Sequence, residues 1–155
     1  MNANDCEKSV PFTLLELKTR YNEIEKTTQY FGTDVSIHKA EIHMVSTIAD
    51  NPGIHVRGLA ELLGITSASV SEIVRKLERK ELIYKETDSN NISRLLLYLT
   101  KKGEHAHGEH LRYHKMLEKA VIEELSLATE QQKTFLVTFL TGLLKRFEEV
   151  EEQLK

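Results

Sequence analysis

Residues 54–80 read IHVRGLAELLGITSASVSEIVRKLERK, and this stretch decides the fold of the chain. It predicts two short helices around a tight turn. Gly64 ends the first helix, because glycine adopts the left-handed conformation of a helix end at little cost. Thr66 stands where a hydroxyl group caps the next helix. The apolar residues at helical spacing are Leu59, Ala60, Leu62 and Leu63 in the first helix and Val70, Ile73, Val74 and Leu77 in the second.

The other face of the second helix carries small residues, hydroxyl groups and cations. Small residues allow a close approach to a DNA major groove, where hydroxyl groups and cations meet phosphates and base edges. An ordinary helical hairpin with a solvated face is the alternative interpretation. The residues that we predict to contact DNA are Ser67, Ser69, Ser71, Arg75, Lys76 and Arg79 on this helix, and Arg94 beyond it.

Composition places the chain among globular proteins. It has 155 residues, of which 40% are apolar and 29% charged. Residues 54–102 hold nine Lys or Arg and six Asp or Glu, although the chain carries a net charge of −3. A mildly basic middle between acidic arms suits a DNA-reading module held by separate scaffolding. No apolar run approaches the ~20 residues of a membrane span, and Cys6 is the single cysteine. We therefore expect a cytoplasmic protein with no membrane partner.

Two helices are expected before the central stretch. The first should run from Pro11 to about Phe31, where Gly32 follows it. Ser36 is the expected cap of the second helix, and residues 51–53 form a turn signal, Asn-Pro-Gly.

Two strands are expected after the central stretch, over residues 82–85 and 95–99. The polar segment 86–91 between them makes a hairpin with an exposed tip. A helix-turn-helix followed by a hairpin is a winged arrangement, in which Arg94 or Lys85 can reach the DNA backbone or minor groove.

Two long helices complete the chain. One is expected over residues 101–125, and Thr129 with Gln132 makes a capping box for the last. The apolar stripe of the last helix has little to cover within a small winged domain, so we expect the first and last helices to form a two-fold dimer rather than to pack only on each other. We predict a mainly α fold with a small β-hairpin wing: a single domain over residues 1–155, with dimerisation helices at 1–36 and 101–155 and a winged helix-turn-helix at 37–100.

The chain resembles the MarR family of winged helix-turn-helix repressors through LAELLGITSASVSEIVRKLERKELI, the hairpin, and LTKKG at residues 99–103. The resemblance implies a homodimer that binds a pseudo-palindromic DNA operator, usually released by a small ligand. The wing departs from the family pattern of Asp-any-Arg. Here the stretch is Asn91-Ile92-Ser93-Arg94, with the arginine one place late.

Four histidines crowd the segment EHAHGEHLRYH, residues 104–114. His110 and His114 are four residues apart on the expected helix, so both rings can meet one ion. A solvated polar helix is the alternative. Leu111 replaces the glutamate of HExxH, so a metalloprotease or other small metallohydrolase is disfavoured.

Within the MarR family, the chain is most similar to the zinc-responsive repressors of zinc uptake. That resemblance implies a Zn²⁺ site made by Glu25 in the first helix, His43 in the second, and His110 and His114 after the wing. Three imidazoles and a carboxylate form a closed tetrahedral set, with no open position for catalysis. We therefore expect a zinc-dependent, non-enzymatic repressor with about one Zn²⁺ per chain. A MarR-like repressor released by an organic ligand remains the alternative.

Overall fold

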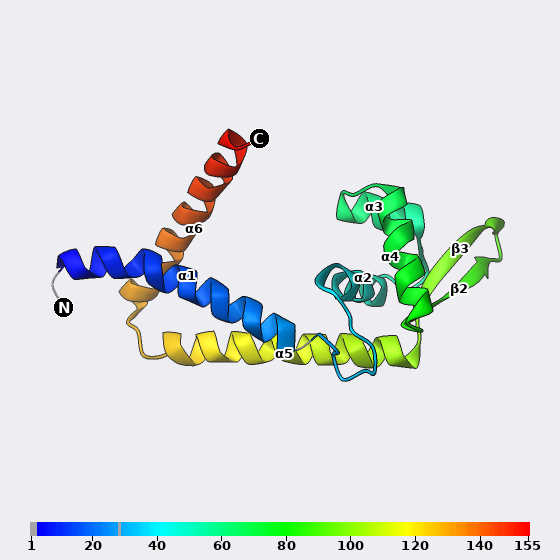
Figure 1. Cartoon of the computed structure of the whole chain (residues 1–155), viewed down its shortest axis with the longest axis horizontal. Coiled ribbons are helices and arrows are strands. Elements are labelled where there is room, and N and C mark those ends of the chain that lie inside the picture. Colours follow the sequence, from blue (N-terminus) through cyan, green and yellow to red (C-terminus); the bar gives the residue numbers. More distant parts are fainter. Residues whose placement is uncertain (1–2, 28) are drawn as a thin grey trace. The chain divides into compact units, whose positions relative to one another are not determined.

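The computed structural model of the chain describes residues 3–27 and 29–155. The mainly helical fold with a small antiparallel sheet is confirmed (Figure 1). The elements in chain order are α1 (Ala3–Thr27), α2 (Lys39–Asp50), β1 (Ile54–His55), α3 (Val56–Leu63), α4 (Ser67–Arg79), β2 (Ile83–Asp88), β3 (Asn91–Leu99), α5 (Lys101–Leu125) and α6 (Glu130–Gln153). The chain divides into two compact units, residues 1–113 and 114–155, with α5 contributing to both.

The helix-turn-helix of the first unit forms as the sequence predicts. Gly64 ends α3 in the left-handed conformation, with φ of 65°. The Thr66 hydroxyl group accepts a hydrogen bond from the backbone N–H of Ser69, 3.2 Å away, and so caps α4. Leu62 and Leu63 belong to the apolar side predicted for this first helix, but they are 57% and 37% exposed. α3 has only eight residues, and helical periodicity does not reveal how far neighbouring elements cover so short a helix.

The core of the first unit joins α2, α3, α4 and the base of the sheet. Apolar side chains that are each less than 2% exposed include Ile37, Val45, Ile48, Leu59, Val70, Val74, Leu77, Leu82 and Leu97. α4, the helix predicted to contact DNA and called the reading helix below, therefore packs on this core with one face. Its opposite face is exposed to solvent.

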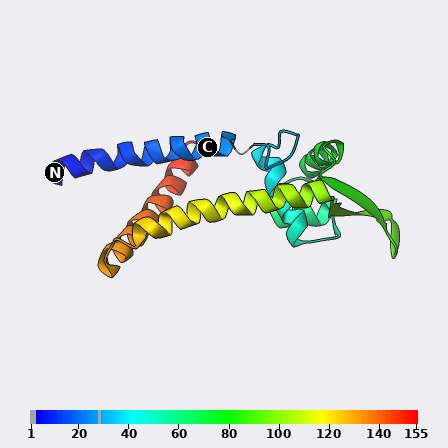
Figure 2. The ribbon, with the colours of Figure 1, turned by 90° about the horizontal axis from the view of Figure 1, so that it is seen from below.

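The hairpin is longer than the sequence predicts, and it gains a third strand. β2 and β3 pair from Ile83–Leu99 to Asp88–Asn91, with an irregularity between Thr87 and Asp88. β1 pairs with the other edge of β3, which gives the order β1-β3-β2. Figure 2 shows the ribbon of β2 and β3 extending away from the helices as a wing.

The two N-terminal helices have shifted ends. α1 runs from Ala3 to Thr27 with Pro11 inside it, rather than from residue 11 to 31; proline removes one backbone donor but does not stop this helix. α2 begins after His38 and not Ser36, because the Glu41 carboxylate accepts the backbone N–H of His38 at 2.8 Å.

The two long C-terminal helices begin where the sequence predicts. At the start of α5, a Cβ on Gly103 would collide with the carbonyl oxygen of Leu82, so glycine lets this helix pack against the residue that precedes β2. At the start of α6, Thr129 and Gln132 form the predicted capping box. None of the described helices is long and apolar enough to cross a membrane.

Candidate DNA interface and metal site

The first turn of α4 presents hydroxyl groups at the helix N-terminus. Ser67 and Ser69 are exposed, and the Ser69 hydroxyl group is 2.9 Å from that of Thr66. A helix N-terminus attracts phosphate through its N–H groups and its dipole. Ser71 is half-buried and donates its hydroxyl to the Ser67 carbonyl at 2.7 Å. The predicted serines therefore lie together at one end of the reading helix.

The cations of α4 lie along its exposed face. Arg75 is exposed and donates from Nε to the Ser71 carbonyl at 3.3 Å, which leans its guanidinium toward the serines. Lys76 pairs with Glu72 at 2.7 Å, and this contact lowers the pKa of the Glu72 carboxyl. Arg79 is exposed at the last turn. The face keeps a positive edge suited to phosphates, although one lysine is internally paired.

The wing carries an ion pair that sequence reasoning missed. Arg94 lies 3.7 Å from the carboxylate of Asp88, whose side chain is 12% exposed. The same carboxylate accepts the backbone N–H of Asn90 at 2.8 Å. Arg94 itself stays half exposed. Lys85, the other expected wing cation, pairs instead with Glu78 of α4 at 2.6 Å. Arg94 is therefore the better placed of the two to reach DNA.

Two of the four predicted metal ligands lie side by side. The rings of His43 on α2 and His110 on α5 have centroids 5.6 Å apart, at an interplanar angle of 47°. His110 is 7% exposed. Its ring packs edge-to-face with that of Phe31, with ring centroids 5.5 Å apart. Its Nδ1 is 3.0 Å from the hydroxyl oxygen of Ser46.

Glu25, the third predicted ligand, pairs with Lys39 of α2 at 3.0 Å. Its carboxylate also acts on α5. Burial raises the pKa of Tyr113 to about 12, and both Tyr21 and the negative charge of Glu25 add to the shift. Tyr113, the phenol on which this charge acts, lies three residues beyond His110 on α5.

The fourth predicted ligand, His114, follows His110 by four residues on α5 and begins the second unit. Within residues 3–27 and 29–155, no three His, Cys, Asp or Glu side chains already cluster as a metal site. The structure thus brings His43 and His110 together, and the complete four-residue set stays a prediction.

The remaining histidines have separate surroundings. His55 caps α3, with Nδ1 accepting the backbone N–H of Gly58 at 3.1 Å, and His38 precedes α2. His105 is exposed and packs over Gly32. His107 turns toward α2, with Nδ1 3.2 Å from the Ser46 hydroxyl.

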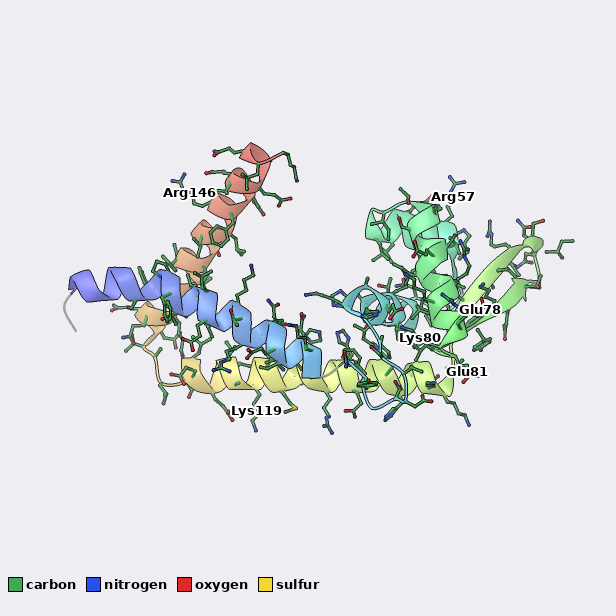
Figure 3. The ribbon with its side chains drawn as sticks, in the orientation of Figure 1. Arg57, Glu78, Lys80, Glu81, Lys119 and Arg146 are labelled. Atoms are coloured by element: carbon green, nitrogen blue, oxygen red, sulfur yellow. The ribbon has the colours of Figure 1, made fainter. Side chains whose placement is uncertain are left out.

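An ion pair missed by sequence reasoning connects α2 to the end of the reading helix. Glu41 is 3% exposed and lies 2.6 Å from the ammonium of Lys80, which also donates to the Ser36 carbonyl at 2.7 Å. Figure 3 labels Lys80 at the end of α4. Burial raises the pKa of Glu41, but Lys80 and the His38 N–H together hold that pKa below its usual value. α2 therefore carries both a predicted metal ligand and a link to α4.

Comparison with known proteins agrees with this architecture. A model of the MarR family matches residues 37–92, which span α2, the helix-turn-helix and most of the wing. The uncharacterized HTH-type transcriptional regulator YhjH of Bacillus subtilis is 26% identical over 134 residues, covering 86% of this chain and 77% of YhjH.

Two solved structures share the fold. Streptococcus pneumoniae FabT in complex with DNA superposes with a TM-score of 0.66 at 23% identity, covering 90% of this chain and 98% of FabT. A variant of Lactococcus lactis ZitR superposes with a TM-score of 0.63 at 21% identity, covering 87% and 97%. These findings show that residues 37–92 match the MarR family model and that the chain shares the fold of FabT and ZitR.

Proposed function

We propose that the chain is a zinc-dependent repressor that binds a pseudo-palindromic operator as a homodimer. Glu25, His43, His110 and His114 would hold about one Zn²⁺ per chain. The observation that carries the proposal is the neighbouring pair of imidazoles from two different helices, His43 on α2 and His110 on α5, with ring centroids 5.6 Å apart.

The two rings fit a shared ion. A Zn–N bond is about 2.0–2.1 Å in a tetrahedral site, so two imidazoles on one Zn²⁺ hold their ring centres roughly 5 Å apart. A separation of 5.6 Å needs only a small adjustment. Because Nδ1 of His110 contacts Ser46, this ring would bind through Nε2.

The ion pair of Glu25 with Lys39 does not oppose metal binding. The Lys39 side chain is 65% exposed, and exposed pairs are worth only about 0–1 kcal/mol. A carboxylate that exchanges an exposed ammonium for a divalent cation loses little. His114 would supply the last ligand, since residues four apart share one side of a helix.

Zinc would act on DNA binding through α2. This helix carries His43, and Glu41 on the same helix forms an ion pair with Lys80, the residue just after the reading helix. A ligand shifts a conformational equilibrium only through different affinities for the two states. A site that closes only when the reading helices have the operator spacing would make zinc a corepressor.

A homodimer would fit the same arrangement. A two-fold pair of chains presents two reading helices, one to each half of a palindrome. Phe139, Leu140 and Phe147 of α6 are 38%, 39% and 60% exposed in the single chain, and a second copy would cover such apolar side chains.

A zinc titration of operator binding tests the proposal. Zinc should tighten operator binding by the wild type about 5–150-fold, the usual range of allosteric coupling. His110→Ala should remove the response, because the tetrahedron is left incomplete. His105→Ala is the matched control: it removes an exposed histidine of the same helix, and it should respond as the wild type does. Equal responses of wild type and His110→Ala, or none in either, would contradict zinc control.

The second candidate is a repressor released by an organic ligand. A cavity of about 250 Å³ lies at the base of the wing, where Tyr84 and Tyr98 stack with ring centroids 5.6 Å apart. Pro52, Glu104 and His107 also line it. Elemental analysis separates the candidates, since the organic-ligand repressor would be purified without stoichiometric zinc.

A further inference from the structure

One hydroxyl group on α2 contacts two imidazoles of α5. Ser46 Oγ is 3.0 Å from Nδ1 of His110 and 3.2 Å from Nδ1 of His107. Ser46 lies three residues after His43 on α2, and the two contacted histidines lie three apart on α5. Ser46 therefore bridges the two helices that bear the neighbouring rings.

The single proton of the hydroxyl group makes this bridge directional. A serine hydroxyl can donate to only one of the two nitrogens, so the other nitrogen must donate to its oxygen. In one arrangement, His110 Nδ1–H donates to Ser46, and Ser46 donates to Nδ1 of His107. In the reverse arrangement, His107 donates, Nδ1 of His110 accepts, and neutral His110 carries its proton on Nε2.

Only the first arrangement suits a metal ligand. A histidine that binds through Nε2 must carry its proton on Nδ1, and the partner of that N–H fixes the tautomer and the ring orientation. In this arrangement, His107 accepts the serine proton at Nδ1. The edge contact of Phe31 with the buried His110 ring further restricts its rotation.

We propose that Ser46 and His107 are positioning residues for the metal site: Ser46 holds His110 with Nε2 toward the metal, and His107 orients the Ser46 hydroxyl group. This inference rests on the proposed function and deepens it. It assigns a role to a histidine that sequence spacing leaves ambiguous, since His107 shares the side of His114 but would not itself bind zinc.

Zinc affinity, measured by competition with a chromophoric chelator, tests Ser46 first. Ser46→Ala should weaken zinc binding about 10–100-fold, as loss of an outer-shell partner typically does. Ser46→Thr keeps the hydroxyl group and should restore most of the affinity. The control is Thr19→Ala, which removes a helix hydroxyl that bonds the Leu15 carbonyl of its own helix. Thermal melts of all variants check that each is folded.

His107 is tested by an acceptor swap and by NMR. His107→Ala should weaken zinc binding less than Ser46→Ala, and His107→Asn, which places a carbonyl oxygen near the lost Nδ1, should recover affinity. In the zinc-loaded wild type, imidazole ¹⁵N shifts should show His107 protonated at Nε2, and Ser46→Ala should abolish this preference.

The outcomes separate this inference from the proposed function. If wild type binds zinc and His110→Ala does not, but Ser46→Ala binds like Thr19→Ala, the positioning role is wrong and the zinc site stands. His107 protonated at Nδ1 in the zinc-loaded protein would also overturn it. If wild type takes up no zinc, both the proposed function and this inference fail.

Discussion

Glu41 is a buried carboxylate that ties α2 to the end of the reading helix through Lys80. Glu41→Gln should lower the free energy of unfolding at pH 7 by about 1–3 kcal/mol. Removing one partner of a fully buried ion pair costs about 3–5 kcal/mol. We expect a smaller loss here because the Lys80 side chain is 24% exposed. Urea denaturation of both proteins measures the difference, and equal stabilities at pH 7 would show that the pair contributes nothing.

The same residue predicts a pH dependence. The pKa of Glu41 is held below its usual value in the folded chain, so the folded state binds this proton less readily than the unfolded state. The stabilisation is then complete above the unfolded pKa of about 4.3 and is lost as the pH falls through the folded value. The difference in free energy of unfolding between wild type and Glu41→Gln should therefore shrink as the pH falls below about 5. A constant gap across that range would contradict the sign.

Substitution of Arg75 tests whether the exposed face of α4 contacts DNA. Its guanidinium leans over the exposed side of α4, away from the buried Val70, Val74 and Leu77. Arg75→Ala should weaken operator binding by about 1–3 kcal/mol and leave the fold intact. Gel-shift titrations measure the change, with Arg20→Ala on α1 as a control for losing one exposed arginine. An unchanged affinity in folded Arg75→Ala would remove Arg75 from the interface.

Among the structural elements, the wing is predicted to contact DNA through Arg94. Arg94 is held beside Asp88 on the hairpin and stays half exposed. If it meets a phosphate, Arg94→Ala should weaken binding similarly for different DNA sequences and reduce the salt slope of log K by about 0.9. Ser93→Ala, which alters the same strand without changing charge, should keep the wild-type slope. A salt slope in Arg94→Ala equal to that of the wild type would show that Arg94 does not contact a phosphate.

Local signals explain which elements the sequence predicts well. Gly64 and Thr66 act within one turn of their own position, so the ends of α3 and α4 are set by neighbours in the chain. β1 has two residues and exists because Ile54 pairs with Leu97, a contact across more than forty positions. No pattern within residues 54–55 contains that information.

The candidate site also combines features set by local spacing with features set by contacts between elements. The exposed face of α4 could be predicted because it depends only on helical spacing within that helix, and its contact with DNA stays a prediction. Asp88, Ser46 and the Glu41–Lys80 pair were missed because each acts through a partner on another strand or helix. For the metal residues, the i, i+4 spacing marks His110 and His114, whereas the nearness of His43 to His110 depends on how α2 packs within the first unit.

At the scale of the whole molecule, α6 has more apolar surface than a single chain uses. None of its residues in the described chain is buried. Its exposed apolar side chains include Phe135, Leu136, Val137, Phe139, Leu140, Leu144, Phe147 and Val150. Contiguous exposed apolar surface of this kind marks an interaction site. Two-fold pairing through the terminal helices would bury it and fix the spacing of two reading helices.

Leu140→Asp tests this pairing. Leu140 lies within the apolar stripe of α6 and is 39% exposed in the single chain, so a charge there would be buried in the dimer at a cost on the order of several kcal/mol. Wild type should be a dimer at micromolar concentration by light scattering, whereas Leu140→Asp should dissociate or misfold and lose tight operator binding. Thr138→Asp is the matched control, because positions 138 and 140 lie about 160° apart around the helix, and it should remain dimeric. A well-folded wild-type monomer, or a Leu140→Asp dimer as stable as Thr138→Asp, would show that α6 serves another contact.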